Sequence, residues 1–174
     1  MSSTQGKDFL QEIPEDKKKL FELKFYVYTD GSCSANKGGW AALVIDNKGK
    51  HTELKGAADQ TTNNRMELTA IINSLVWLLE KFQDESVRQY VCVDLYTDST
   101  YCTNSIREWI DKWITDGSIA SRPNAELLLQ VHQLVQKFGS NLTIKWLPRN
   151  STEELTYCDR IANDMRESLS KASN

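Results

Sequence analysis

The sequence predicts one α/β domain: a mixed five-stranded sheet, in which a three-strand antiparallel meander is followed by parallel strands, with helices on both faces. Three runs of β-branched and aromatic residues come first, each bounded by turn-forming residues. Segments with apolar residues every three or four positions then alternate with two further strand-like runs. A meander followed by right-handed crossovers gives such a sheet, and 174 residues is an ordinary length for one domain.

Aromatic residues and glycines mark the three strands of the meander. The first contains the run Phe-Tyr-Val-Tyr at residues 25–28 and should end at Asp30, because Gly31 and Ser32 are turn-forming. Gly38 and Gly39 should separate it from the second strand, and Asp-Asn-Lys-Gly at residues 46–49 is typical of a hairpin turn. The strands are expected at residues 24–30, 40–45 and 51–57.

Four amphipathic helices are expected after the meander. The first carries apolar residues at i, i+3, i+4, i+7, i+8 and i+11 from Leu68 to Leu79, which is one buried face. The second has an apolar face between residues 102 and 113, the third starts near residue 123, and the last spans about residues 152–169. The fourth and fifth strands are expected at residues 91–98 and 142–147.

Composition excludes several classes of protein. The net charge of −3 argues against strong non-specific nucleic-acid binding. The apolar stretches are far shorter than a membrane span and the first residues do not resemble a signal peptide, so we expect a cytoplasmic protein. Four cysteines without CxxC spacing indicate reduced thiols. We expect a monomer without an obligatory protein partner, with residues 1–23 as a flexible or partly helical appendage to a domain at residues 24–170.

The tripeptide Tyr-Thr-Asp occurs twice, and each copy ends a strand-like run. Asp30 and Asp98 are the two carboxylates, and both are followed by turn-forming residues. Sites in open α/β sheets lie at the carboxyl ends of strands, so these side chains should converge at one edge if their strands are neighbours. Two unpaired anions repel each other unless a cation lies between them, and carboxylate oxygens favour Mg²⁺ or Mn²⁺.

Glu67 follows the segment Thr-Thr-Asn-Asn-Arg-Met at residues 61–66, and two interpretations of it are open. In the first, Asn64 caps the helix and Glu67, three residues later, completes a capping box. In the second, the start of this helix lies beside the end of the first strand, and Glu67 is a third carboxylate at the same point. The order of the elements favours the second interpretation.

These motifs resemble ribonuclease H type 1. The resemblance rests on Tyr-Thr-Asp-Gly-Ser-Cys, then Thr-Thr-Asn-Asn-Arg-Met-Glu-Leu, then Tyr-Thr-Asp-Ser, and it covers about residues 24–165. It implies a ribonuclease H-like fold and an endonuclease that hydrolyses the RNA strand of RNA/DNA hybrids with two divalent ions, leaving 3′-hydroxyl and 5′-phosphate ends. The family's metal-binding carboxylates match Asp30, Glu67 and Asp98.

The fourth carboxylate of the family lies on the last helix, where this chain offers Asp159 and Asp164. At about 100° per residue, the apolar residues of this helix define its buried direction. Asp159 lies roughly 80° from that direction, on the rim, whereas Asp164 lies roughly 140° away and faces solvent. The family's Cys-Asp pair followed by a short apolar turn also matches Cys158 and Asp159. We therefore predict Asp159 as the fourth catalytic and metal-binding residue.

The resemblance also implies a set of substrate-binding residues. The side chains of Asn63 and Asn64, with backbone near Cys33, match groups that sense the 2′-hydroxyl of RNA. Thr62 and Asn36 match residues that contact the strands, and Trp109 matches an aromatic residue beside the DNA channel, although core packing would explain it equally well. The predicted substrate-binding residues are Cys33, Asn36, Thr62, Asn63, Asn64, Trp109 and Asn124.

The chain departs from the family in three places. Thr100 replaces a usual glutamine-like residue, and the handle at residues 114–124 has Arg122 as its only base. The loop before the last helix, Pro-Arg-Asn-Ser-Thr at residues 148–152, lacks the usual mobile histidine. These departures leave turnover open. Three alternatives to a free-standing ribonuclease are a non-catalytic hybrid-binding module, a domain of a retroelement reverse transcriptase and a junction-resolving nuclease.

Overall fold

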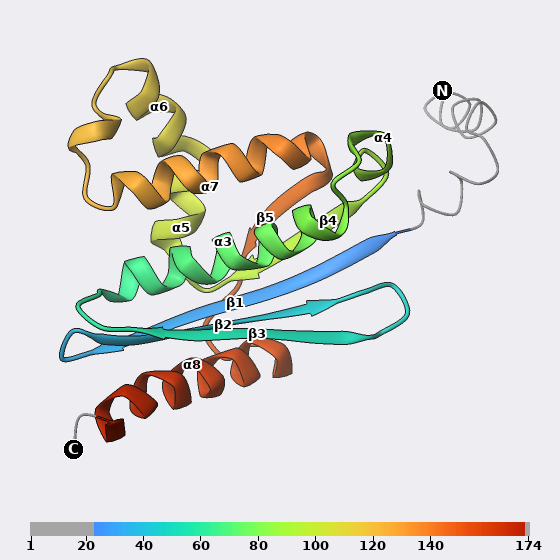
Figure 1. Cartoon of the computed structure of the whole chain (residues 1–174). Helices are drawn as coiled ribbons and strands as arrows, with labels where there is room; N and C mark the ends of the chain where they lie inside the picture. Colours follow the sequence, from blue (N-terminus) through green and yellow to red (C-terminus); the bar gives the residue numbers. More distant parts are fainter. Residues whose placement is uncertain (1–22, 173–174) are drawn as a thin grey trace.

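The sheet has five strands in the spatial order β3-β2-β1-β4-β5, in a computed structural model that describes residues 23–172 (Figure 1). β1 (Lys24–Ser34), β2 (Lys37–Ile45) and β3 (His51–Ala58) form the antiparallel meander. β4 (Cys92–Thr97) pairs in parallel with β1, and β5 (Leu142–Trp146) pairs in parallel with β4. The predicted fold class is confirmed.

Helices cover both faces of the sheet. α3 (Asn63–Lys81) packs on β1 and β2, and α7 (Ala125–Phe138) packs on α3. α8 (Glu153–Ala172) crosses the opposite face and packs on β1, β2 and β3 (Figure 1). The shorter helices are α4 (Glu85–Arg88), α5 (Thr100–Asn104), α6 (Ile110–Thr115), a π-helical turn at Ser105–Trp109 and 3₁₀ turns at Ile119–Ser121 and Gly139–Asn141.

Each face of the sheet has its own apolar cluster. The larger cluster lies between the sheet and α3, α5 and α7, and it includes the fully buried residues Val27, Leu68, Leu75, Leu95 and Leu128. The smaller lies under α8 and consists of Ala41, Leu43, Cys158 and Ala162. Two clusters fix two helices, α3 and α8, on opposite faces of the same strands.

The expected end of the first strand at Asp30 is wrong. β1 continues through Gly31 and Ser32 to Ser34, and a two-residue turn joins it to β2, which starts at Lys37 rather than Trp40. Both turn residues, Ala35 and Asn36, have positive φ, as a tight hairpin of this length requires.

Glycine in these strands serves close packing rather than turning. A Cβ at Gly31 would lie 2.4 Å from the backbone nitrogen of Glu67, and one at Gly39 would lie 2.1 Å from the carbonyl oxygen of Ala162. Helices α3 and α8 therefore approach the strand backbones at these positions from the two faces. Periodicity in the sequence does not distinguish this use of glycine from a turn.

The predicted second helix is interrupted. A π-helical turn at Ser105–Trp109 separates α5 from α6, and π turns often lie at functional positions. Ile110 is fully buried in the larger apolar cluster, whereas Trp109 is partly exposed and its ring packs against that of Trp113. The short helix α4 was not expected from the sequence.

The ends of the predicted domain are described only in part. The predicted appendage lies outside the described residues except for Leu23, which packs against the larger apolar cluster. α8 continues three residues beyond the predicted end at Leu169, to Ala172. Among residues 23–172, none of the helices is long and apolar enough to span a membrane.

Candidate active site

Parallel pairing of β1 with β4 brings Asp30 and Asp98 to the same level of the sheet. The last residues paired between the two strands are Thr29 and Thr97. Asp30 is the next residue of β1, and Asp98 comes directly after the end of β4. Beyond this level β1 pairs only with β2, where Asp30 faces Ala41. The two carboxylates thus lie where β4 ends and the sheet opens, as the repeated tripeptide predicted.

Glu67 joins them from α3. The helix begins at Asn63, and the cap is Thr62, whose hydroxyl accepts a hydrogen bond from the backbone N–H of Arg65. The interpretation of Asn64 as the cap is therefore wrong. Glu67 lies in the second turn, next to Gly31, and is only 5% exposed. A glutamate that completed a capping box would lie at the exposed helix end, so the third-carboxylate interpretation fits better.

The three carboxylates form a close cluster. One carboxylate oxygen from each of Asp30, Glu67 and Asp98 lies within 4.8 Å of the others. Burial, together with the nearby negative charge of Asp98, raises the pKa of Asp30 to about 7. Burial, together with the charges of Asp30 and Asp98, also raises the pKa of Glu67. Burial raises the pKa of Asp98, while the Arg149 guanidinium opposes this shift.

The cluster has the properties of a cation site. Its donors are all carboxylate oxygens, which hard divalent cations such as Mg²⁺ and Mn²⁺ prefer. The Oε2 atom of Glu67 is buried and has no hydrogen-bond partner among the described residues. A buried anionic oxygen without a partner is strongly unfavourable unless a cation or proton compensates it. These residues therefore fit a divalent cation.

Asp159 borders the same cleft from α8. Its Oδ1 accepts a hydrogen bond from Nη2 of Arg149 at 3.2 Å, and its Oδ2 accepts one from the Asn163 side-chain amide at 3.4 Å. Asp164 is exposed and does not line the cleft. The helical phase derived from the sequence therefore agrees with the side-chain positions, although Asp159 is not one of the three clustered carboxylates.

The cleft has a volume of about 400 Å³ and is polar. It combines residues from β1, α3, the end of β4, the loop before α8, and α8 itself. Its lining residues are Asp30, Gly31, Ser32, Cys33, Asn63, Glu67, Asp98, Arg149, Asp159, Asn163 and Arg166. Four carboxylates and two guanidinium groups thus share one surface.

The predicted substrate-binding residues divide into three groups, of which two lie in or near the cleft. Cys33 and Asn63 line the cleft beside the carboxylates, whereas Asn36, Thr62 and Asn64 are exposed nearby in the β1–β2 turn and at the start of α3. The backbone N–H of Thr61 donates to the carbonyl of Asn36, which ties this turn to the start of α3.

Asn124 and Trp109 lie outside the cleft lining. Asn124 accepts a hydrogen bond from the Arg65 guanidinium and donates one to the Tyr101 hydroxyl. The ring of Trp109 packs against that of Trp113, with 5.8 Å between the centroids.

Sequence reasoning missed three residues of the cleft: Ser32, Asn163 and Arg166. Asn163 and Arg166 stand four and seven residues after Asp159, so they share its face of α8. This spacing could have identified them. Ser32 is buried and was interpreted as a turn residue.

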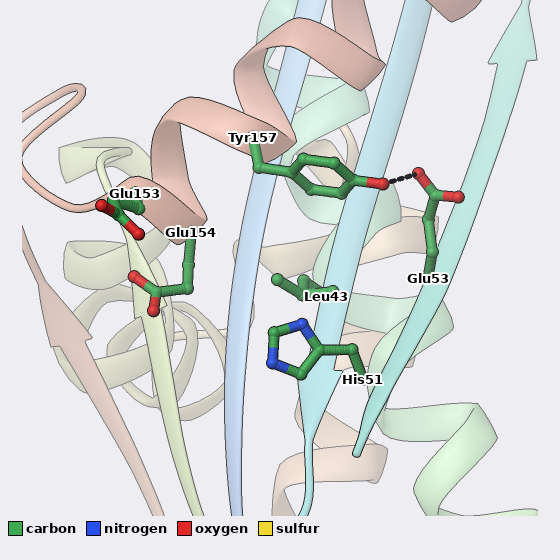
Figure 2. A pocket seen from close by; sticks show the side chains of 6 residues that line it. All are labelled: Leu43, His51, Glu53, Glu153, Glu154 and Tyr157. Atoms are coloured by element: carbon green, nitrogen blue, oxygen red, sulfur yellow. Dashed lines mark hydrogen bonds between the residues drawn. The ribbon is translucent and has the colours of Figure 1, made fainter. Parts of the chain in front are cut away.

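Neither histidine of the chain lines the cleft. His132 lies in α7 with its Nδ1 3.8 Å from a carboxylate oxygen of Asp111. His51 lines a separate cavity between β3 and the start of α8, and Figure 2 shows its ring beside Leu43. In the same cavity the Tyr157 hydroxyl donates to Glu53 at 2.9 Å, which links α8 to the edge strand (Figure 2).

Comparison with known proteins gives consistent matches. The family model for RNase H matches residues 22–167. A ribonuclease H from Acetivibrio thermocellus is 35% identical over 155 residues, covering 85% of this chain and 98% of the relative. One from Anaplasma marginale is 46% identical over 122 residues, covering 69% of this chain and 73% of the relative.

Solved structures match the fold. The crystal structure of LC11-RNase H1 in complex with RNA/DNA hybrid superposes with a TM-score of 0.59 at 22% identity, covering 83% of this chain and 98% of that one. At 22% identity this match supports the fold and carries no information about the site.

The pKa of Asp30 predicts how stability depends on pH without bound metal. The folded-state pKa is about 7, whereas an aspartate in an unfolded chain has a pKa of about 4. The folded protein therefore binds more protons between these values, and its stability falls as the pH rises through this window. Asp30→Asn should flatten the dependence and exceed the wild type in stability at pH 8 by roughly 1 to 3 kcal/mol.

Urea unfolding in EDTA from pH 4 to pH 8 measures this effect. Asp164→Asn is the matched control. Because Asp164 is exposed, this substitution should leave the pH dependence of stability unchanged. Parallel curves for the wild type and Asp30→Asn would show that folding does not raise the pKa of Asp30.

Proposed function

The chain belongs to the ribonuclease H family, whose enzymes hydrolyse the RNA strand of RNA/DNA hybrids, and we propose that it does so with two divalent cations held by Asp30, Glu67, Asp98 and Asp159. The observation that carries the proposal is the three-carboxylate cluster, with one buried oxygen that lacks a partner, at the base of a polar cleft. A non-catalytic hybrid-binding module would gain nothing from four carboxylates facing phosphate.

The four carboxylates are assigned to two cation positions. Asp30, Glu67 and Asp98 converge closely enough to share one cation, and Asp159 borders the cleft where it can hold a second. Divalent cations held by these carboxylates would activate the attacking water and would stabilise the charge on the departing 3′-oxygen. The carboxylates position these ions and need not accept a proton themselves. Mg²⁺ is the proposed physiological ion, with Mn²⁺ as a substitute.

Arg149 holds Asp159 in position at the rim of the cleft. Its guanidinium donates to Asp159 and is mostly exposed, with 71% of its side-chain surface accessible. It stands in the loop that lacks the family's histidine. A guanidinium at this place can compete for the product phosphate and draw it away from the carboxylate cluster, so Arg149 is the residue we assign to product release.

Recognition of RNA is assigned to the residues beside β1 and the start of α3. Cys33 and Asn63 line the cleft next to the carboxylates, and Asn64 is exposed nearby. We propose that Asn63 and Asn64, with the backbone near Cys33, sense the 2′-hydroxyl that distinguishes RNA from DNA. A junction-resolving nuclease would have no use for this pair, because its DNA substrate lacks that hydroxyl.

The DNA strand is assigned to more distant residues. Thr62 and Asn36 would contact the strands, and Asn124 and Trp109 would lie along the DNA channel. Figure 1 shows α6 and the loop to α7 standing off from the sheet. The guanidinium of Arg122, the only base of the handle, lies 4.6 Å from the ring centroid of Trp113. It is therefore partly engaged by the protein itself, which supports weak binding of the hybrid by this handle.

The thiols support the cellular setting that we propose. Cys33, Cys92, Cys102 and Cys158 are all free, which supports a reducing compartment and hence the cytoplasm. We propose that the enzyme acts there as a monomer on RNA/DNA hybrids.

Metal removal and the clustered carboxylates give the main test. Only the RNA strand of a strand-labelled hybrid should be cut, and excess EDTA should abolish cutting. Asp30→Asn, Glu67→Gln and Asp98→Asn should each reduce kcat by at least about 100-fold, because each removes a charge that holds the cation. Cutting that persists in EDTA would refute the two-metal mechanism.

Melting temperatures measured on the same three variants separate catalysis from folding. Because Thr62 rather than Glu67 caps α3, Glu67→Gln should keep or raise the melting temperature of the metal-free protein. A loss of about 1 kcal/mol in the free energy of unfolding, with activity retained, would instead support the capping role.

Duplex RNA and duplex DNA are the substrate controls for the cleavage assay, and both should stay intact.

The two aspartates of α8 should behave differently. Asp159→Asn should cripple cleavage supported by Mg²⁺, because Asp159 borders the cleft, whereas Asp164→Asn should be near neutral, because Asp164 faces solvent. Initial rates over a range of Mg²⁺ concentrations measure both effects. The opposite ranking would exclude Asp159 as the fourth carboxylate.

The loop and the handle together predict a slow enzyme with weak affinity for the hybrid. Asn150 is the nearest match to the missing histidine, and it lies one residue after Arg149 with a positive φ of 56°. Asn150→His should raise the multiple-turnover rate more than the single-turnover rate, because a histidine there helps the product phosphate leave. If the wild type already turns over quickly and Asn150→His changes neither rate, Arg149 alone is sufficient for product release. Arg149→Gln should then slow multiple turnover.

A further inference from the structure

Two guanidinium groups lie in the cleft, and their surroundings differ. Arg149 donates to Asp159, so a carboxylate compensates its charge. Arg166 donates through Nη1 to the hydroxyl of Ser32 at 2.6 Å, and the carboxylate nearest to it, on Glu167, is 3.9 Å away. Among the described residues that line the cleft, Arg166 is thus the cation without a carboxylate at hydrogen-bond distance.

Arg166 is held in place by a chain of hydrogen bonds. The Ser32 hydroxyl that accepts from Arg166 donates in turn to Oδ1 of Asn163 at 2.6 Å. The amide of Asn163 donates to Oδ2 of Asp159 at 3.4 Å. The guanidinium is therefore positioned relative to the metal-binding carboxylates, and its side chain is 24% exposed, so it is ordered by the protein yet open to the cleft.

We propose that Arg166, positioned by Ser32 and Asn163, binds the phosphate of the RNA strand that neighbours the scissile phosphate; this site rests on the proposed function. Ser32 stands two residues after Asp30 on β1, and Cys33 and Asn63 line the same part of the cleft. The anion nearest to a scissile phosphate at the carboxylate cluster is the adjacent phosphate of the same backbone.

Neutral partners make Arg166 suited to this task. One Nη1 donor is used by the Ser32 hydroxyl, and the planar guanidinium has further N–H donors that match phosphate oxygens. The cation would also offset part of the repulsion between a polyanionic strand and four carboxylates. Binding of this kind orients the strand and favours the attack geometry.

Arg166→Gln tests the site, with Arg160→Gln as the matched control. Arg160 is on the same helix but outside the cleft, with its guanidinium 5.2 Å from the ring centroid of Tyr157. Arg166→Gln should raise KM for the hybrid about tenfold, change kcat less, and lower the slope of log KM against log salt by about one unit. Arg160→Gln removes the same net charge and should change neither.

A charge deletion in the substrate gives the direct readout. Hybrids with a single methylphosphonate linkage at successive positions of the RNA strand lack one phosphate charge each. The linkage next to the cleavage point should penalise the wild type and Arg160→Gln about tenfold, and should leave Arg166→Gln unaffected. Ser32→Ala, which loosens the guanidinium without removing its charge, should show a smaller loss with an unchanged salt slope.

The outcomes separate this site from the proposed function. If the wild type cleaves the hybrid but Arg166→Gln matches Arg160→Gln in KM and salt slope, the phosphate site is wrong and the ribonuclease activity stands. Equal methylphosphonate penalties for the wild type and Arg166→Gln would also overturn the site. If the wild type leaves the hybrid intact with Mg²⁺ and Mn²⁺, the proposed function itself fails.

Discussion

Mutual repulsion of carboxylates is the constraint on which the rest of this structure depends. Asp30, Glu67 and Asp98 are held with oxygens within 4.8 Å of one another, two of them almost fully buried. Burial and like charge both raise their pKa values, so the fold alone does not favour three ionised groups there. The surrounding scaffold must hold the three carboxylates together. A cation bound between them would relieve their repulsion, which favours its binding.

Two close approaches supply that scaffold. Gly31 lets the backbone of α3 touch β1, which brings Glu67 to Asp30, and Gly39 lets α8 touch β2, which brings Asp159 to the same cleft. Each approach is backed by its own apolar cluster on one face of the sheet. A side chain at either glycine would push a helix outwards, and the carboxylates on that helix would move with it. The position of each carboxylate is therefore set by packing more than by its own contacts.

The sequence predicted those features that depend on local patterns. Alternation and periodicity identified the five strands and the long helices, and the repeated tripeptide located Asp30 and Asp98, because parallel pairing places equivalent residues at one level. The helical phase of α8 separated Asp159 from Asp164, because the rotation between successive residues of a helix places these two on different faces. The extension of β1 through Gly31 to Ser34 was missed because Gly31 and Ser32 are turn-forming residues, whereas in the structure they pair with β2 and Gly31 lies against α3. The spacing of Arg166 from Asp159 was visible in the sequence, but its hydrogen bond to Ser32, 134 residues away, was not.

The distribution of positive charge explains how such a cleft can accept a polyanion. The handle offers Arg122 alone, and that guanidinium lies over Trp113. The cleft, in contrast, holds Arg149 and Arg166 on the two sides of Asp159, connected through Asn163 and Ser32. Charge at the cleft contacts the strand where it is cut, so it binds the hybrid at the cleavage point rather than along its whole length. Because the handle contributes little, binding of the hybrid then depends on the cleft itself, where the contacts that hold the strand also place it against the carboxylates.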